Sequence, residues 1–525
     1  MATGAELGYN INATALQMAN SIFGQGVTVV GASYQGDSRS SAIYSNGDAL
    51  SPGVVPGDTG VILSTGQARD FTQSGGDPNR SSSTTTNTSG ANNDPLLNAI
   101  AGTSTFDASI LNVDFIPTGN VMTMRFVFSS EEYPEFAASQ FNDIVGVWIN
   151  GTHVPLAVGN GNPSVTNIGP TNSSNLFVDN TADQFNTEMD GFTLTMSLTI
   201  PVNAGVVNSI RIGIADVSDS SYDSNLLIAG NSGQTRLIAI PDHEKLFVGQ
   251  TKTIDVLGND QNFTGGTLTI THINGVAVLP GQSVLLPSGD TVTLNADGTL
   301  TVQADADVDT FHFTYDVQSS TGLIDTGMVT ISTIPCFVAG TLIRTPSGDR
   351  PVESLAPGDL VMTHDDGAQP LRWTGRRSVP ATGTMAPIRI RAGTFGPHGT
   401  LMLSPQHRVL VRDSAAELLF GEAEVLVAAK DLVNGRSIRV VEGGMVDYVH
   451  LLFDRHQVIF SEGLATESFL PGPQTTQGFE TEIVAEIYTL FPEIDPATGL
   501  GYGASVRRAL KAHEARVLMA EGRAA

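Results

Sequence analysis

Short apolar runs separated by polar, glycine-rich stretches fill most of this chain, and that pattern predicts strands rather than helices. Up to about residue 235 the runs are interrupted by clusters of Gly, Asn, Asp and Ser, which favour turns. The strands expected there are Gly60–Leu63, Met122–Phe128, Ile144–Ile149, Phe192–Ile200 and Ile210–Ile214. The run Ser81–Ser89 contains only Ser, Thr and Asn, and we expect it to be a mobile loop.

Two segments have helical spacing instead. Residues 12–22 predict a short amphipathic helix with Asn12 as its N-cap. Residues 504–521 predict a terminal helix that packs on the last domain. Its apolar stripe would consist of Val506, Leu510, Val517 and Leu518.

The segment from residue 237 to residue 334 has strand spacing typical of a β-sandwich. Candidate strands are Thr251–Val256, Thr267–Ile273, Thr291–Leu294, Thr299–Gln303, Thr310–Val317 and Thr326–Ile331, and Asp297-Gly298 is a hairpin signal. This segment resembles an Ig-like or cadherin-like bacterial domain, a likeness strengthened by Val256-Leu257-Gly258-Asn259-Asp260. The resemblance implies a spacer.

The chain of 525 residues is therefore predicted to be mostly β and multi-domain. We expect a β-sandwich-like N-terminal domain over residues 1–235 and an Ig/cadherin-like sandwich over 236–334. An all-β domain over 335–475 and a C-terminal strand and helix tail over 476–525 would follow.

Charge and composition narrow the functional classes. The formal net charge is −27, most of it before residue 336, which excludes nucleic acid and an anionic membrane surface as partners. No stretch approaches the roughly 20 apolar residues of a membrane span. The N-terminus has no basic and apolar signal-peptide pattern. An acidic, Lys-poor, Cys-free β segment is nevertheless typical of secreted or cell-surface modules, either calcium-loaded or acidic for solubility alone.

The chain has one cysteine, Cys336, so it forms no intramolecular disulfide. Such a thiol is either a buried spectator or a nucleophile. As a thiolate, Cys336 could attack the carbonyl of Pro335 and convert the amide into a thioester. A free thiol has a pKa near ~8.5, so the attack needs activation. His407, on a Ser-Pro-x-His turn, is placed to protonate the leaving nitrogen, and such catalysis contributes ~10²–10⁴-fold.

Three motifs occur in order around these residues. They are Cys336-Phe337-Val338-Ala339-Gly340-Thr341 with Gly358-Asp359-Leu360-Val361, then Leu403-Ser404-Pro405-Gln406-His407, then the stretch from Tyr448 to Ser468. Together they resemble the blocks of Hint (Hedgehog/intein-type) domains over roughly residues 336–470. The resemblance implies that Cys336 is the nucleophile, that His407 activates the scissile amide with help from Ser404, and that Pro335–Cys336 is the scissile bond.

The closing block departs from inteins, which end in His-Asn, because this chain has Thr466-Glu467-Ser468 there. We expect no full splicing but cleavage or acyl transfer at the N-terminal side, without a cofactor. The acceptor is unknown and could be water, a thiol or an amine. A second base could be Glu467, Ser468, His450 or His456. The alternative is a non-catalytic adhesion or surface-binding protein with an inactive Hint fold. Arg408 is expected to be a strand-face residue and Asp359 a turn residue.

The N-terminal part carries its own motifs. Phe126-Val127-Phe128-Ser129-Ser130-Glu131-Glu132-Tyr133 is followed by Phe141-Asn142-Asp143, and Asp216, Asp219 and Asp223 form a second acidic group. With Gly60–Gly66 these resemble the bacterial choice-of-anchor L domain over about residues 25–235. The resemblance implies a surface or secreted module with a possible cell-surface target. Candidate Ca²⁺ ligands are Glu131, Asn142, Asp143, Asp216, Asp219 and Asp223, and the alternative is solvated loop carboxylates.

Overall fold

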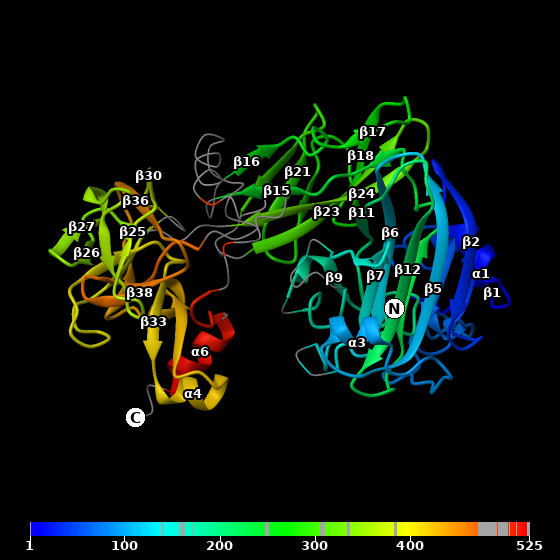
Figure 1. Ribbon diagram of the computed structural model, residues 1–525, viewed down its shortest axis with the longest axis horizontal. Coiled ribbons are helices and arrows are strands. Elements are labelled where there is room, and N and C mark those ends of the chain that lie inside the picture. Colours follow the sequence, from blue (N-terminus) through cyan, green and yellow to red (C-terminus); the bar gives the residue numbers. More distant parts are fainter. Residues whose placement is uncertain are drawn as a thin grey trace. The chain divides into compact units, whose positions relative to one another are not determined.

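The computed structural model describes residues 2–137, 139, 141–156, 158, 163–170, 172–246, 251–304, 310–332, 337–382, 386–470, 491, 502, 505–510 and 512–521. The chain divides into two compact units. The first comprises residues 1–242, 253–302 and 311–330, and the second comprises 243–252, 303–310 and 331–525. Both are built mainly of antiparallel strands (Figure 1), which confirms the prediction of a mostly β, multi-domain protein.

The N-terminal domain is a sandwich of two sheets. One has the order β1 (Gly8–Asn10), β3 (Ser41–Ser45), β4 (Gly60–Ser64), β13 (Ser224–Ala229), β6 (Val121–Ser130), β10 (Gly191–Thr193) and β9 (Phe177–Asp179), with β11 (Met196–Pro201) also paired to β6. The other has the order β2 (Val27–Gln35), β5 (Thr105–Pro117), β12 (Asn208–Val217), β7 (Ile144–Ile149) and β8 (Thr152–His153). The helices are α1 (Ala15–Ile22), α2 (Gly47–Leu50) and α3 (Pro95–Ala101), with 3₁₀ turns η1 (Ala68–Phe71) and η2 (Ser174–Leu176).

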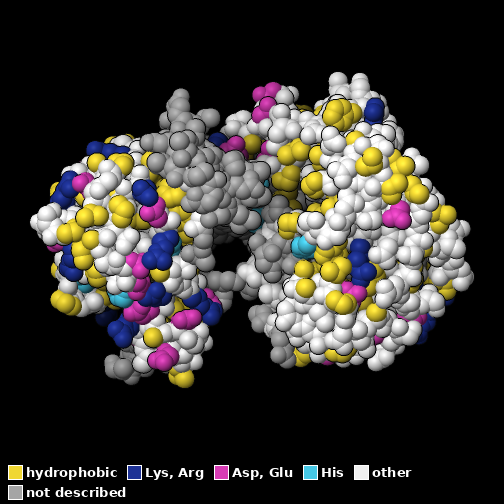
Figure 2. Space-filling view, viewed as in Figure 1, with side chains coloured by type: hydrophobic (Ala, Val, Ile, Leu, Met, Phe, Trp, Pro, Cys, Tyr) yellow, Lys and Arg dark blue, Asp and Glu magenta, His cyan; other side chains and the backbone are white. Residues whose placement is uncertain are grey.

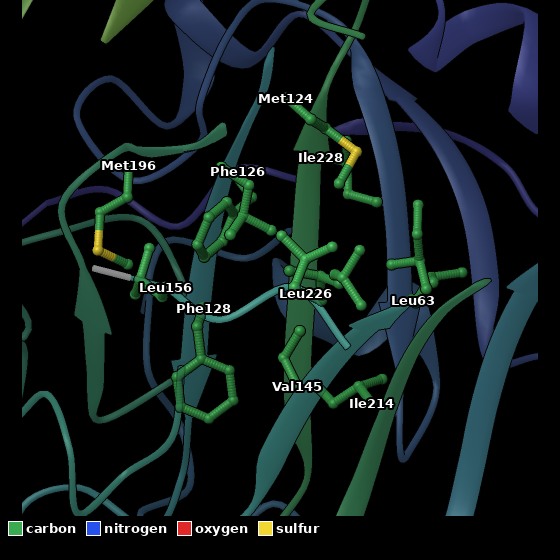
Figure 3. Close-up of a cluster of buried hydrophobic side chains, with 14 of the residues drawn as sticks. Leu63, Met124, Phe126, Phe128, Val145, Leu156, Met196, Ile214, Leu226 and Ile228 are labelled. Carbon is green, nitrogen blue, oxygen red and sulfur yellow. The ribbon is translucent and has the colours of Figure 1, made fainter. Parts of the chain in front are cut away.

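Alternate residues of the central strands point into the core between these sheets (Figure 3). Phe126 and Phe128 of β6 lie across from Ile228 and Leu226 of β13. Val127, between the two phenylalanines, faces a second buried cluster on the other side of the sheet. Because both faces are covered, β6 is a nearly continuous apolar run, which is why the sequence predicted it, whereas β13 was not among the predicted strands.

Two predicted boundaries in this domain were wrong. The first helix begins at Ala15 and not at residue 12, because Thr14 is its N-cap and forms a capping box with Gln17. The run Phe192–Ile200 is divided between β10 and β11. The division falls where the amide of Leu194 donates to the carbonyl of Leu176 (2.8 Å) instead of joining a neighbouring strand.

The segment after residue 236 consists of short strands with two sheets. One includes β24 (Ile324–Ser332), β23 (Thr310–Ser319), β18 (Leu268–Ile273) and β19 (Val276–Ala277) in that order, and the other has the order β16 (Thr251–Ile254), β22 (Leu300–Gln303), β21 (Thr291–Leu294) and β20 (Ser283–Leu285). The described residues of this segment also form the strands β14 (Leu237–Ile238), β15 (Asp242–Lys245) and β17 (Gln261–Asn262). The hairpin predicted at Asp297-Gly298 joins β21 to β22, and Gly298 has the positive φ (+86°) that such a turn requires.

The second unit contains two six-stranded sheets. One has the order β30 (Trp373–Pro380), β36 (Met445–Leu452), β25 (Phe337–Val338), β32 (Leu401–Leu403), β31 (Ile388–Ile390) and β35 (Ile438–Val440). The other has the order β27 (Gly348–Pro351), β26 (Leu342–Thr345), β37 (Val458–Ser461), β38 (Leu464–Glu467), β33 (Arg408–Arg412) and β34 (Glu424–Ala428). Among the described residues this unit also has the hairpin β28 (Leu360–Met362) to β29 (Ala368–Pro370), the helices α4 (Ser414–Phe420) and α6 (Ala512–Glu521), and the 3₁₀ turns η3 (Val352–Ser354) and η5 (Ala429–Leu432). Side chains of both sheets share one core.

The predicted terminal helix is shorter than expected. It begins at Ala512, and residues 505–510 are not helical. Instead, the carbonyl of Arg508 accepts a hydrogen bond from the amide of Leu426 (2.8 Å), and the amide of Leu510 donates to the carbonyl of Leu426 (2.8 Å). The segment thus covers the outer edge of β34, and an unpaired strand edge is otherwise an exposed row of backbone donors and acceptors. Among the helices described, none has the length and apolar character needed to cross a membrane.

Candidate functional site

His407 lies on the turn between β32 and β33, and its side chain is almost fully buried. Its amide donates to the carbonyl of Ser404 (3.1 Å), and its carbonyl accepts from the amide of Ala429 (3.0 Å). A further bond joins the amide of Lys430 to the carbonyl of Pro405 (2.8 Å). Backbone bonds therefore hold the turn against η5. Ser404 is also buried, at the start of the same turn.

Phe337 brings the start of this domain to that turn. As part of β25 it pairs with Leu403 of β32, directly before the turn, and with Val449 of β36. Its ring centroid lies 4.1 Å from that of His407, with 54° between the ring planes. Pro335 and Cys336 lie outside the described residues. Cys336 is, however, bonded to Phe337, so His407 contacts the residue that immediately follows the candidate nucleophile.

The first motif forms tight turns. Gly340 has φ +91°, which favours glycine, and its amide donates to Glu353 Oε2 (2.7 Å). Asp359 Oδ2 accepts from the amide of Ala356 (2.9 Å) and pairs with Arg350 (3.1 Å). These two contacts lower the pKa of Asp359. Asp359 is thus the turn residue that the sequence predicted.

Glu467, on β38, is fully buried beside this turn. Its Oε1 accepts from the amide of Arg408 (2.9 Å), and its Oε2 accepts from Arg408 Nη1 (3.0 Å). Burial alone would raise the pKa of Glu467, but the Arg408 charge and the hydrogen bond to His456 outweigh burial and lower it to about 2. The carboxylate is therefore ionised at neutral pH and holds the residue that follows His407.

His456 links Glu467 to the C-terminal segment. His456 Nε2 lies 3.5 Å from Glu467 Oε2 and 3.2 Å from the carbonyl oxygen of Ser468. His456 Nδ1 accepts a hydrogen bond from the amide of Val506 (3.1 Å). A nitrogen that accepts from an amide cannot carry a proton itself, so the proton of neutral His456 is on Nε2. The backbone of the tail thereby fixes the tautomer.

The other candidate bases have different surroundings. Ser468 Oγ accepts from the amide of Gln457 (3.0 Å), which ties together the ends of β37 and β38. His450, on β36, packs with its ring centroid 5.5 Å from that of Phe469. The structure thus joins His456 and Glu467 to each other and to the His407 turn, and places Ser468 and His450 in structural contacts.

The sequence analysis missed two residues that contribute to this site. Arg408 was expected only to cover a strand face, but it is the principal partner of a buried carboxylate. Its position directly after His407 was the available signal. Val506 contributes a backbone amide, which no side-chain pattern reveals.

The six predicted calcium ligands do not form one group. Glu131, Asp143, Asp216 and Asp223 are buried, whereas Asn142 and Asp219 are partly exposed. Asn142 Oδ1 accepts from the amide of Thr166 (2.8 Å), and Asp219 Oδ1 accepts from the amide of Ser221 (3.1 Å). Asp219 therefore closes a local turn, whereas Asn142 is bonded to a segment 24 residues further along the chain.

Asp143 is held by the protein itself. Its Oδ1 accepts from the amide of Val217 (3.0 Å), and its Oδ2 accepts from Ser224 Oγ (2.6 Å). Burial raises the pKa of Asp143 to about 7, and burial together with the Asp143 charge raises the pKa of Asp216. Both oxygens of Asp143 thus accept hydrogen bonds from the protein, and Asp143 is not an open cation ligand.

Comparisons with known proteins agree with this architecture. Family models match a choice-of-anchor L domain at residues 9–234, a bacterial Ig domain at 237–332 and a Hint domain at 335–473. The chain therefore contains a choice-of-anchor L domain and a Hint domain, as the motifs indicated. No curated protein matches the chain.

The solved structures that the chain resembles are distant. One is the M60 catalytic domain with the CBM51-1 and CBM51-2 domains of Clostridium perfringens ZmpB, at 10% identity and a TM-score of 0.12, covering 70% of this chain and 34% of that one. This chain thus spans about a third of its length. Another is Drosophila OTK, extracellular domains 3–5, at 12% identity and a TM-score of 0.15, covering 64% of this chain and 87% of that one.

Proposed function

We propose that the Hint domain of this chain is an autoprocessing domain that cleaves the Pro335–Cys336 peptide bond through a thioester. The observation that carries the proposal is the contact between the rings of Phe337 and His407 at 4.1 Å. It puts a buried imidazole beside Phe337, the residue bonded to Cys336, and the backbone nitrogen of Cys336 is the scissile amide nitrogen.

In the first step the sulfur of Cys336, having lost its proton, attacks the carbonyl carbon of Pro335. A carbon–sulfur bond forms and the carbon–nitrogen bond breaks. The nitrogen of Cys336 takes up a proton as it leaves, and His407 is the group proposed to deliver it. The products are a thioester on Cys336 and a free amine on the same residue, so the step conserves all atoms and needs no cofactor.

In the second step a nucleophile attacks the thioester carbonyl and releases the thiol. Water would free the N-terminal part as an acid, whereas a thiol or amine on a partner would take it over covalently. Thr466-Glu467-Ser468 provides no asparagine to cyclise at the end of the domain, so we expect no excision of the Hint domain. The choice-of-anchor L domain would be the released or transferred module, at the cell surface or in the medium.

Proton transfer requires an imidazole held in position, and the contacts around Glu467 support that requirement. Glu467 binds both the amide and the guanidinium of Arg408, directly after His407. His456 in turn contacts Glu467 through a nitrogen whose proton is fixed by Val506. This arrangement supports a role for Glu467 and His456 in positioning the turn that carries Ser404 and His407.

The test compares the full chain with its Cys336→Ala variant on denaturing gels, with and without dithiothreitol or hydroxylamine. We expect the wild-type chain of 55.0 kDa to divide into two fragments, faster with either nucleophile, and mass spectrometry to place the break at Pro335–Cys336. The variant should stay intact. If both chains stay intact in every condition, self-cleavage is wrong and a surface-binding protein with an inactive Hint fold is the better interpretation.

A further inference from the structure

A polar cavity of about 360 Å³ lies in the N-terminal domain. Four segments that are distant in the sequence line it: the chain start at Glu6, residues 69–74 in and after η1, the loop between Arg80 and Thr84, and Glu188. Its volume falls within the range of roughly 300–1,000 Å³ that is typical of small-molecule sites. The cavity therefore has the size of a binding site.

Hydrogen bonds tie these four segments together. The amide of Glu188 donates to the carbonyl of Phe71 (3.0 Å), and the amide of Arg80 donates to Glu188 Oε2 (3.0 Å). Thr72 Oγ1 accepts from the amide of Leu7 (3.0 Å). Because backbone groups take part in each of these bonds, the cavity is already formed before a ligand enters, and a preformed site loses less entropy on binding.

Two polar groups that line the cavity lack a partner. The Glu188 side chain is 5% exposed, and its Oε1 has no hydrogen-bond partner among the described residues. Gln73 Nε2 is buried and is unpartnered in the same sense. A buried donor or acceptor without a partner destabilises the folded chain, so a ligand that satisfies both groups gains affinity from them.

Charges of both signs meet in this cavity. Glu6, Asp70 and Glu188 contribute carboxylates, Arg69 and Arg80 contribute guanidinium groups, and Arg69 Nε donates to Glu6 Oε1 (2.5 Å). Residues 1–335 contain only eight Lys and Arg, and two of them are here. Charged side chains are sparse on the face of this unit drawn in Figure 2. The cavity is thus rich in charged groups, but their charges nearly cancel, which disfavours a strongly anionic or cationic ligand.

The lining also disfavours an apolar ligand, because every described residue in it has a polar or charged side chain. A hydroxyl group can donate and accept at once, so a molecule with several hydroxyls suits an unpartnered acceptor and an unpartnered donor together. We propose that this cavity binds a neutral saccharide, with Glu188 Oε1 accepting from one sugar hydroxyl and Gln73 Nε2 donating to another. The guanidinium groups of Arg69 and Arg80 would donate to further sugar oxygens.

This site gives the expected surface target of the N-terminal domain a chemical class. It lies entirely within the first unit and does not depend on cleavage at Pro335–Cys336. A failed cleavage assay would therefore leave it standing, and a failed sugar-binding assay would not affect the proposed cleavage.

The experiment uses the full chain with Cys336→Ala, so that self-cleavage cannot affect the result. The probes are the methyl glycosides of glucose, galactose, mannose and N-acetylglucosamine, followed by saturation-transfer NMR and calorimetry. We expect at least one of them to bind with a Kd of about 1 mM, as is usual for a ligand of this size. Glucuronate, which adds a carboxylate, should bind more weakly than methyl glucoside, and stronger binding of glucuronate would overturn the neutral class.

Two variants and a matched control locate the sugar. Glu188→Gln and Gln73→Leu should each weaken binding about tenfold, because each removes one hydrogen bond to the ligand. Gln73→Leu should not lower the Tm, since it removes a buried donor that has no partner. Asp77→Asn changes an exposed carboxylate of the same loop region that is not part of the lining, and it should bind as the parent does. Absence of binding by all four glycosides, or unchanged binding by Glu188→Gln or Gln73→Leu, would overturn the proposal.

Discussion

The ring of Phe337 packs against the ring of His407, with 4.1 Å between the centroids, and this contact joins the beginning of the Hint domain to the turn that carries its histidine. Phe337 is held on both sides, by β32 and by β36. The backbone of Phe337 is therefore positioned relative to the His407 imidazole by two strands. In a reaction that depends on orientation, a displacement of about 1 Å can lower the rate about 10²-fold.

Phe337→Leu is expected to slow self-cleavage by at least about tenfold, because the smaller side chain leaves the imidazole without its packing partner. The free energy of unfolding should fall by only about 1–2 kcal/mol. Gel densitometry over time measures the rate. Phe453→Leu, at another buried position in the same core, is the control for lost packing alone. Equal slowing of the two variants would contradict a specific role for Phe337.

His407→Ala is expected to reduce the cleavage rate by about 10²–10⁴-fold, the usual contribution of a positioned acid or base. Added dithiothreitol should not restore the rate, because the thiol acts after the thioester has formed. His364→Ala, at an exposed position in the same unit, should cleave at the wild-type rate. A His407→Ala chain that cleaves normally would remove His407 from the mechanism.

Glu467→Gln is expected to destabilise the second unit by about 1.5–3 kcal/mol, because it replaces charge-assisted hydrogen bonds to Arg408. The pKa of Glu467 is lowered to about 2, so its contribution is complete above its ordinary pKa near 4.5 and is lost as pH falls from there towards 2. Urea unfolding followed by Trp373 fluorescence in a Cys336→Ala, Trp148→Phe chain measures this. Glu417→Gln, on the exposed face of α4, is the control, and a pH dependence unchanged by Glu467→Gln would refute the assignment.

Val506→Pro removes the amide that donates to His456 Nδ1. We expect the His456 ring to lose its fixed tautomer, which ¹⁵N chemical shifts of the imidazole would report in a Cys336→Ala chain. Cleavage in the chain that keeps Cys336 should slow about tenfold, equivalent to ~1.4 kcal/mol. Val506→Ala keeps the amide and should resemble the wild type in both measurements. If the proline variant keeps the same tautomer, the tail does not set it.

The sequence predicted several strands because the turns that bound them carry their own signals, but it missed β2, β5 and β13. The hairpin at Asp297-Gly298 and the sharp turn at Gly340 need residues that tolerate positive φ, and the chain has them there. The predicted start of the terminal helix was wrong because of a tertiary contact. Within residues 505–510, backbone groups form hydrogen bonds with Leu426 at the edge of β34 instead of with one another.

Only those residues of the site that form recognisable local sequence motifs could be predicted. His407 was found because it heads a strand behind a Ser-Pro-x turn. The partnership of Glu467 with Arg408 depends on the pairing of β38 with β33, which joins Thr466 to Val409 across the sheet. No local pattern encodes that register. The same holds for Glu131, whose buried carboxylate oxygens have no hydrogen-bond partner among the described residues, because the strands of its sheet come from distant segments.

The pH dependence of the N-terminal domain offers a test of the charge on Glu131. Glu131 has its pKa raised to about 9 in the folded chain, mainly by burial, from an ordinary value near 4.5. The folded state therefore holds this proton more tightly than the unfolded state, and its stabilising effect is complete below pH 4.5 and is lost as pH rises towards 9. In a Cys336→Ala chain with chelator present, the Tm of the domain should fall between pH 5 and pH 9. Glu131→Gln should reduce that fall, to which Glu132, with its pKa raised to about 10, and Asp223, with its pKa raised to about 7, also contribute. Asp114→Asn, at an exposed position on β5, should keep the fall. If the parent and Glu131→Gln chains lose stability equally over this range, Glu131 is already charged in the folded protein and some other group compensates for it.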